Sequence, residues 1–177
     1  ETGVHIVHCP ESNLKLASGF CPVAKLLNND INVALGTDGA ASNNDLDLMG
    51  EMRTAALLAK AVSKDASALP ANQALAMATL GGARALGIDE QVGSLRPGKW
   101  ADITAIQLAA IETQPLFNPI SDLVYAASRH QVTNVWIEGR RVLKDRQLTT
   151  LDESEIRSRI RIWRERLMTN QPSTNTH

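Results

Sequence analysis

The chain has 177 residues, of which 44% are hydrophobic, and its 18 basic and 19 acidic side chains leave a net charge of -1. This composition is typical of a globular protein with enough apolar residues to bury a sizeable core. The balanced charge gives no electrostatic reason to expect binding to nucleic acid or an anionic membrane, and no apolar run approaches the roughly 20 residues of a membrane span or forms a signal peptide.

The first predicted element is a strand at residues 4–9, an apolar and β-branched run that Pro10 ends. No initiator Met precedes it, and a strand so close to the start predicts that further chain came before it. The two cysteines, Cys9 and Cys21, do not form a disulfide framework. We expect two reduced, buried thiols in a cytoplasmic protein.

The two histidines of this strand are expected to lie on opposite faces of it. Side chains of a strand point to opposite faces in turn, so His5 and His8 face apart. Together with a spacing that matches no standard zinc pattern, this argues against a metal cluster of His5, His8, Cys9 and Cys21. His8 is expected either to hydrogen-bond a neighbour at the strand end or to face a site.

A polar loop and a short helix at residues 23–29, opened by Pro22, lead to a second strand at residues 31–35. Gly36 ends that strand, and the turn Thr37-Asp38-Gly39 follows it. Parallel strands with helical crossovers are the usual outcome of this alternation, and ligands bind at the carboxyl ends of such strands. From the residues alone, Asp38 is either a turn former or a carboxylate that binds a ligand.

Helices are predicted next at residues 46–62, after possible caps at 43–45, and at residues 71–86, where Gly81 and Gly82 suit close helix packing. The pattern then changes to a small β unit with a strand at 103–106 and a hairpin about Glu138-Gly139, with a short helix at 121–130 between them. The last predicted element is an amphipathic helix that carries five arginines. Because acidic residues lie near them, a solvated basic face is favoured over a nucleic-acid patch.

Four segments follow from this pattern. Residues 1–90 form an α/β portion, 91–150 a β unit, 151–169 the terminal helix, and 170–177 a disordered tail. A complete eight-stranded barrel takes about 250 residues, more than this chain has.

Four stretches resemble one family in the same order along the chain. HCPESNLKL at residues 8–16 and VALGTDGAASNN at residues 33–44 resemble the metal-dependent amidohydrolases, most closely the 5′-methylthioadenosine/S-adenosylhomocysteine deaminase group with its chlorohydrolase relatives. GSLRPGKWAD at residues 93–102 resembles the return into that family's β-sandwich, and VWIEGRRV at residues 135–142 its closing hairpin. The resemblance covers nearly the whole chain up to the tail.

The resemblance implies the C-terminal portion of a (β/α)8 TIM-type barrel, namely its last two strands and helices, with part of a composite β-sandwich and a C-terminal helix. The family holds one divalent metal, usually zinc and in some members iron or another ion, through a His-x-His on strand one, a His on strand five and an Asp on strand eight. Only the Asp has a counterpart here, Asp38, and no His-x-His occurs in the chain. The family's assisting Glu and its sixth-strand His also have no counterpart.

The implied reaction is hydrolytic deamination of a purine nucleoside by metal-activated water, with Asp38 as metal ligand and proton acceptor. Ser42 would lie in the substrate mouth, or else serve as a capping hydroxyl. Asn13 and Ser12 would border the pocket, or else order the loop, and His8 is a further candidate for contact with the substrate. The family also implies a cytoplasmic homo-oligomer.

Other interpretations stay open. The family includes guanine and cytosine deaminases and triazine hydrolases, although Gly39 stands where chlorohydrolases carry Asn, which favours the adenosine-type enzymes. A second class of function is a non-catalytic fragment or assembly module, which the missing ligands would fit.

Overall fold

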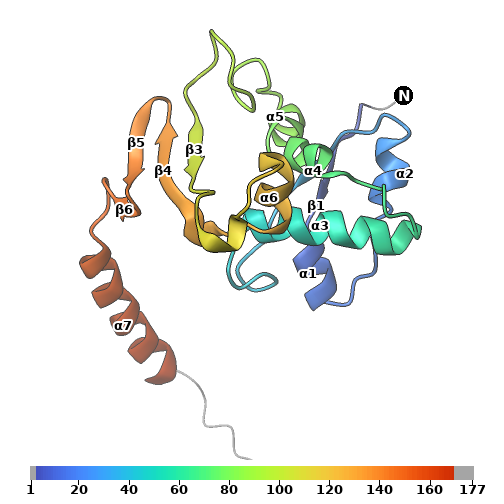
Figure 1. Ribbon diagram of the computed structural model, residues 1–177. Helices are drawn as coiled ribbons and strands as arrows, with labels where there is room; N and C mark the ends of the chain where they lie inside the picture. Colours follow the sequence, from blue (N-terminus) through green and yellow to red (C-terminus); the bar gives the residue numbers. More distant parts are fainter. Residues whose placement is uncertain (1–2, 170–177) are drawn as a thin grey trace, which may run out of the picture.

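The computed structural model describes residues 3–169, so the predicted tail at 170–177 lies outside the described residues (Figure 1). The order of elements is β1 (Ile6–His8), α1 (Pro10–Lys15), α2 (Val23–Leu27), β2 (Val33–Leu35), α3 (Leu48–Ser63), α4 (Ala71–Ala78), α5 (Leu80–Leu86), β3 (Ile103–Ile106), η1 (Ile111–Thr113), α6 (Pro119–Tyr125), η2 (Arg129–Gln131), β4 (Val132–Ile137), β5 (Arg140–Lys144), β6 (Gln147–Leu148) and α7 (Glu153–Thr169).

The predicted parallel pairing of the first two strands is confirmed. β1 and β2 are hydrogen-bonded in parallel, with Ile6 opposite Val33 and His8 opposite Leu35. Both strands are shorter than predicted, with three residues each. All three residues of β2 are buried, as expected for a parallel strand that is covered on both faces.

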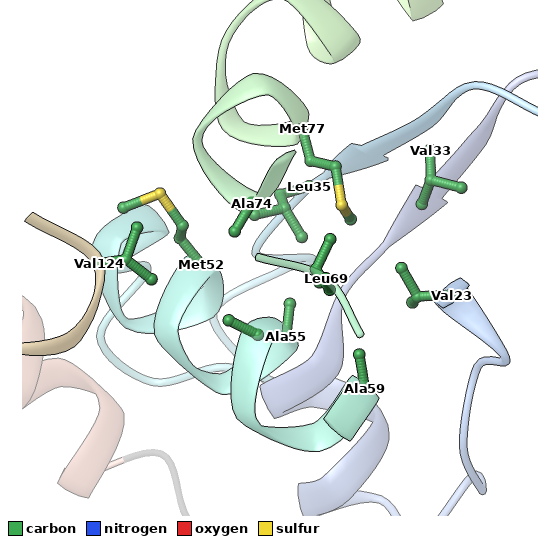
Figure 2. Close-up of a cluster of buried hydrophobic side chains, with 11 residues drawn as sticks. Val23, Val33, Leu35, Met52, Ala55, Ala59, Leu69, Ala74, Met77 and Val124 are labelled. Atoms are coloured by element: carbon green, nitrogen blue, oxygen red, sulfur yellow. The ribbon is translucent and has the colours of Figure 1, made fainter. Parts of the chain in front are cut away.

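Helices α3, α4 and α5 contact β2, and residues of α3, α4 and β2 make up most of the hydrophobic core (Figure 2). Helix α3 contributes buried residues at the spacing of one helix face, among them Met52, Ala55 and Ala59. Helix α5 lies close to β2 at Gly81, where a Cβ atom would stand 3.0 Å from the carbonyl oxygen of Val33. The same expectation for Gly82 is wrong, because an added Cβ there would meet open space.

Two element boundaries in this region differ from the prediction. The single helix expected at residues 71–86 is two helices, because the backbone of Thr79 (φ -128°, ψ -93°) leaves the helical region between α4 and α5. Helix α3 starts two residues late, since Leu46 has a positive φ of 50°. Its cap is Asp47, whose carboxylate accepts a hydrogen bond from the Met49 amide, and not a residue at 43–45.

A third difference matters more for the site. The segment after β1, expected as a turn and polar loop, contains helix α1. Pro10 occupies its first turn, where a missing amide hydrogen costs nothing. Six residues are too few to show helical periodicity, so the pattern could not reveal the helix.

The C-terminal half forms an antiparallel sheet in the order β3-β4-β5-β6. The predicted hairpin is confirmed, with Glu138 (φ 50°) and Gly139 (φ 76°) both in the left-handed region that such tight turns require. Strand β6 was not predicted. The helix expected at 121–130 is α6, which ends at Tyr125, followed by the short turn η2.

The predicted terminal helix is α7, and Figure 1 shows it extending away from the small sheet. Arg157 pairs with Glu153 and Arg159 with Glu155 one turn apart, which agrees with a solvated basic face. The apolar residues Ile160 and Trp163 of this helix are also exposed.

Within residues 3–169, no helix is both long enough and apolar enough to cross a membrane.

Candidate active site at the end of strand β2

Asp38 lies three residues beyond β2, at the carboxyl end of the parallel pair. Its side chain is exposed, and its backbone φ of 59° is in the left-handed region, which Asp adopts more readily than most residues. The loop that follows ends at Leu46, which also has a positive φ. Both ends of the loop therefore have conformations that its surroundings must hold in place.

Two serine hydroxyls converge on one oxygen of the Asp38 carboxylate. The Oγ atom of Ser42 lies 2.6 Å from Asp38 Oδ2 and that of Ser12 lies 2.8 Å from the same oxygen. The Ser42 hydroxyl also lies 3.1 Å from the carbonyl oxygen of Gly39. The structure thus places Ser42 beside Asp38, while its position in a substrate mouth stays a prediction.

These contacts favour the ionised form of Asp38. The hydroxyl of Ser42, then that of Ser12, and then the amide of Gly39 hold the pKa of the Asp38 carboxyl below its ordinary value, because each donates to the negative charge. Asp38 is therefore a carboxylate at neutral pH, which is the form that binds a cation or accepts a proton.

Helix α1 holds the Asp38 loop from one side. Besides Ser12, Lys15 reaches across with its Nζ atom 2.9 Å from the carbonyl oxygen of Ala41 and 2.6 Å from Asn44 Oδ1. Among the described residues, Ser12 and not Asn13 is the α1 side chain that bonds to Asp38. Asn13 is partly buried in the same helix.

A buried carboxylate that sequence reasoning missed lies on the other side. Glu51 of α3 has 0% exposure, and its Oε2 atom accepts a hydrogen bond from the Glu11 amide at 3.0 Å, while Oε1 accepts one from Asn43 Nδ2. Burial raises the pKa of the Glu51 carboxyl. Its spacing was a usable signal, because Glu51 lies four residues before Ala55 and eight before Ala59, on the buried face of the helix.

His8, the remaining candidate, is buried in β1 with 3% exposure. Within the described part of the chain its Nδ1 atom has no hydrogen-bond partner, so the predicted bond to a neighbour is not seen at that atom. Burial lowers the pKa of the His8 imidazole below its ordinary 6.5, which favours the neutral ring.

Burial of His8 predicts a loss of stability in mild acid. The unfolded chain takes up a proton as the pH falls below 6.5, whereas the folded chain does so only at lower pH. The contribution of His8 to the free energy of unfolding should therefore be full above about pH 6.5. Below that pH it should fall by up to about 1.4 kcal/mol per pH unit, until the pH passes the pKa of His8 in the folded chain. Chemical denaturation from about pH 8 to 5 measures this slope. His8→Gln should flatten this slope.

A metal ion would find one suitable ligand here. Asp38 is an ionised, exposed carboxylate, which suits zinc or another divalent ion. Among residues 3–169, however, no three His, Cys, Asp or Glu side chains are grouped so as to hold a metal.

The cysteines Cys9 and Cys21 are free and only partly buried, rather than buried as expected, and burial raises the pKa of both thiols.

A hollow of about 440 Å³ lies elsewhere, between the end of α3, the start of α4 and helix α6. Lys60, Asn72, Asn118 and Tyr125 contribute to its lining, and Asp38 does not. The exposed carboxylate is thus not enclosed by that hollow.

Comparison with protein families places this geometry in a known context. The model of the amidohydrolase family matches residues 1–142. A 5-methylthioadenosine/S-adenosylhomocysteine deaminase of Teredinibacter turnerae is 53% identical over 166 residues, which are 94% of this chain and 38% of the relative. The chain therefore spans well under half the length of this relative.

Solved structures are also similar to this chain. A crystal structure of an adenosine deaminase from Xanthomonas campestris with bound zinc is 56% identical and superposes with a TM-score of 0.93, over 94% of this chain and 38% of that one. An atrazine chlorohydrolase from Arthrobacter aurescens in complex with zinc is 28% identical, with a TM-score of 0.85 over 90% of this chain and 36% of that one.

Proposed function

The chain belongs to the amidohydrolase family, and from this we propose that it is the C-terminal part of a zinc-dependent hydrolytic deaminase of adenosine-type nucleosides. The substrates that we propose are 5′-methylthioadenosine and S-adenosylhomocysteine, which a relative with 53% identity is named for. One observation carries the proposal: Asp38 is an ionised, exposed carboxylate at the carboxyl end of a buried parallel strand, inside the stretch that the family matches.

The fold supports the same proposal. Residues up to about 90 would be the last two strands and helices of a (β/α)8 barrel, with β1 as strand seven and β2 as strand eight. The antiparallel sheet β3-β4-β5-β6 within residues 91–150 would be part of a β-sandwich, and α7 within residues 151–169 a C-terminal helix. The parallel β1-β2 pair and the separate antiparallel sheet are what this division requires.

The metal ion, when bound, supplies a water molecule whose pKa is lowered towards ~7. Asp38 would hold the ion through one carboxylate oxygen and accept a proton from the nucleophile, for which its ionised state is required. Ser12 and Ser42, both on Oδ2, would fix the orientation of the carboxylate. The remaining metal ligands would come from outside residues 3–169, since these contain no grouped set of three.

The substrate would enter beside the loop that contains Ser42, with Asn13 and His8 at the border of the pocket. His8 and Asn13 belong to the segment that leads into and forms α1, the helix that holds the Asp38 loop. We propose a cytoplasmic homo-oligomer that acts on small purine nucleosides.

A second candidate is hydrolysis of a triazine, which the likeness to the atrazine chlorohydrolase favours. Gly39 follows Asp38 here, and this favours the adenosine-type reaction over the chlorohydrolase one. Deamination of guanine or cytosine belongs to the same reaction class and differs only in the groups that contact the base. A non-catalytic role for this chain belongs to a different class.

Assay of the full-length gene product tests the proposal. Zinc-loaded protein should convert 5′-methylthioadenosine, S-adenosylhomocysteine or adenosine to the inosine-type product, which is followed by the change in purine absorbance. Turnover of atrazine, guanine or cytosine without turnover of any nucleoside would favour the alternatives. Absence of turnover with all six compounds would refute the proposed function. Bound zinc and turnover, measured on this chain alone, would separate the proposed function from the non-catalytic role.

A further inference from the structure

We propose that Glu51 is a positioning residue for Asp38, acting through the two serines that hold that carboxylate. The inference rests on the proposed function in so far as Asp38 binds the metal. The contacts that carry it lie entirely within this chain.

Each oxygen of Glu51 holds the residue next to one of the two serines. Oε2 accepts a hydrogen bond from the amide of Glu11, the residue before Ser12. Oε1 accepts one from the side chain of Asn43, the residue after Ser42. One carboxylate thus joins the start of α1 to the Asp38 loop, and both segments then meet again at Asp38 Oδ2.

The chemistry of these contacts requires a carboxylate. Asn43 accepts a hydrogen bond from the Leu46 amide on its Oδ1 at 3.3 Å, which directs its NH₂ group to Glu51. Both partners of Glu51 are therefore donors, and each needs an acceptor. A glutamine would offer one acceptor and one NH₂ group, so one of the two partners would face a donor.

An apolar residue could fill this position without the cost of burying a charge. Glu51 shares the buried helix face of Ala55 and Ala59, and burying a charge is costly unless it is hydrogen-bonded. Its two hydrogen bonds reach segments 40 and 8 residues away, and so offset that cost. We therefore assign Glu51 to the geometry of the Asp38 loop and not to the core alone.

The test compares Glu51→Ala and Glu51→Gln with Met52→Ala in the full-length gene product. Met52 is the adjacent buried residue of α3 and packs in the apolar cluster. Hydrogen exchange of the amides in residues 38–46 and the zinc dissociation constant are measured for each variant. Glu51→Ala should speed exchange in this loop and weaken zinc binding, by no more than the roughly 10–100-fold that follows the loss of a direct supporting contact to a metal ligand. Glu51→Gln should fall between Glu51→Ala and wild type.

Met52→Ala should lower the melting temperature but leave loop exchange and zinc affinity close to wild type. Adding Glu51→Ala to the Ser12→Ala/Ser42→Ala pair should weaken zinc binding little further, because Glu51 acts through those hydroxyls. The inference would be overturned if both Glu51 variants showed wild-type exchange in the loop. It would also be overturned if Met52→Ala changed loop exchange and zinc affinity as much as Glu51→Ala does, or if the losses of zinc affinity from the Glu51 and serine changes were fully additive. A wild-type protein that binds no zinc would refute the proposed function, while loop exchange would still decide the role of Glu51.

Discussion

Asp38→Asn in the full-length gene product is expected to lower kcat/KM for adenosine-type nucleosides by a factor on the order of 10²–10⁴, the range for loss of a positioned proton acceptor. The change keeps the shape of the side chain but removes its charge. A neutral amide is a weaker metal ligand and does not accept a proton at neutral pH. It also turns an NH₂ group toward the serines in one of its two orientations. Steady-state rates of inosine-type product formation measure the effect.

Asp45→Asn is the matched control for this change. Asp45 lies on the same loop, is exposed, and pairs with Arg129 at 3.0 Å. Because exposed ion pairs contribute little, we expect the activity of this variant to stay near wild type. Full activity of Asp38→Asn, or equal losses in both variants, would contradict a direct role for Asp38 in the reaction.

Met52→Ala is expected to lower the free energy of unfolding by about 2–5 kcal/mol, the usual cost of truncating a buried methionine. Met52 is 2% exposed and belongs to the cluster that joins α3 to Val124 of α6 (Figure 2). Its removal leaves a cavity that the surrounding helices fill only in part. Urea denaturation followed by circular dichroism measures the difference.

Leu57→Ala provides the comparison on the same helix. Leu57 is 53% exposed, and changes at such surface positions usually stay within about 0.5 kcal/mol. Equal losses in the free energy of unfolding for both variants would contradict the burial of the Met52 face of α3.

The position of Asp38 directly after a buried strand could be predicted from the sequence, because strand, glycine and turn follow one another over a few residues. Its role as a metal ligand was implied only by the family resemblance. Parallel pairing of β1 with β2 followed from the same local pattern, since alternating strands and helices allow few arrangements. Ser42 lies four residues from Asp38, within reach along the chain. The position of Asp38 and the nearness of Ser42 depend on short sequence separations, whereas the strand pairing joins Ile6 to Val33 and depends on the few arrangements that the alternation allows.

The rest of the site depends on contacts between distant segments. Ser12 lies 26 residues before Asp38, and a six-residue helix with no periodicity of its own presents it. Glu51 contacts Glu11 across 40 residues. No local pattern encodes such pairings, although the buried position of Glu51 could have been inferred from its helix face. The break at Thr79 was hidden for a different reason, because the residues on both sides of it favour a helix.

The zinc content of the full-length gene product and its Asp38→Asn variant tests the central claim most directly. Both are purified, dialysed against zinc-free buffer and measured by elemental analysis, with Asp45→Asn as control. We expect about one zinc per chain in wild type and Asp45→Asn, and a large loss in Asp38→Asn, since a catalytic zinc held by few protein ligands tolerates the loss of one poorly. Stoichiometric zinc in Asp38→Asn, retained as tightly as in wild type, would contradict the assignment of Asp38 as a metal ligand.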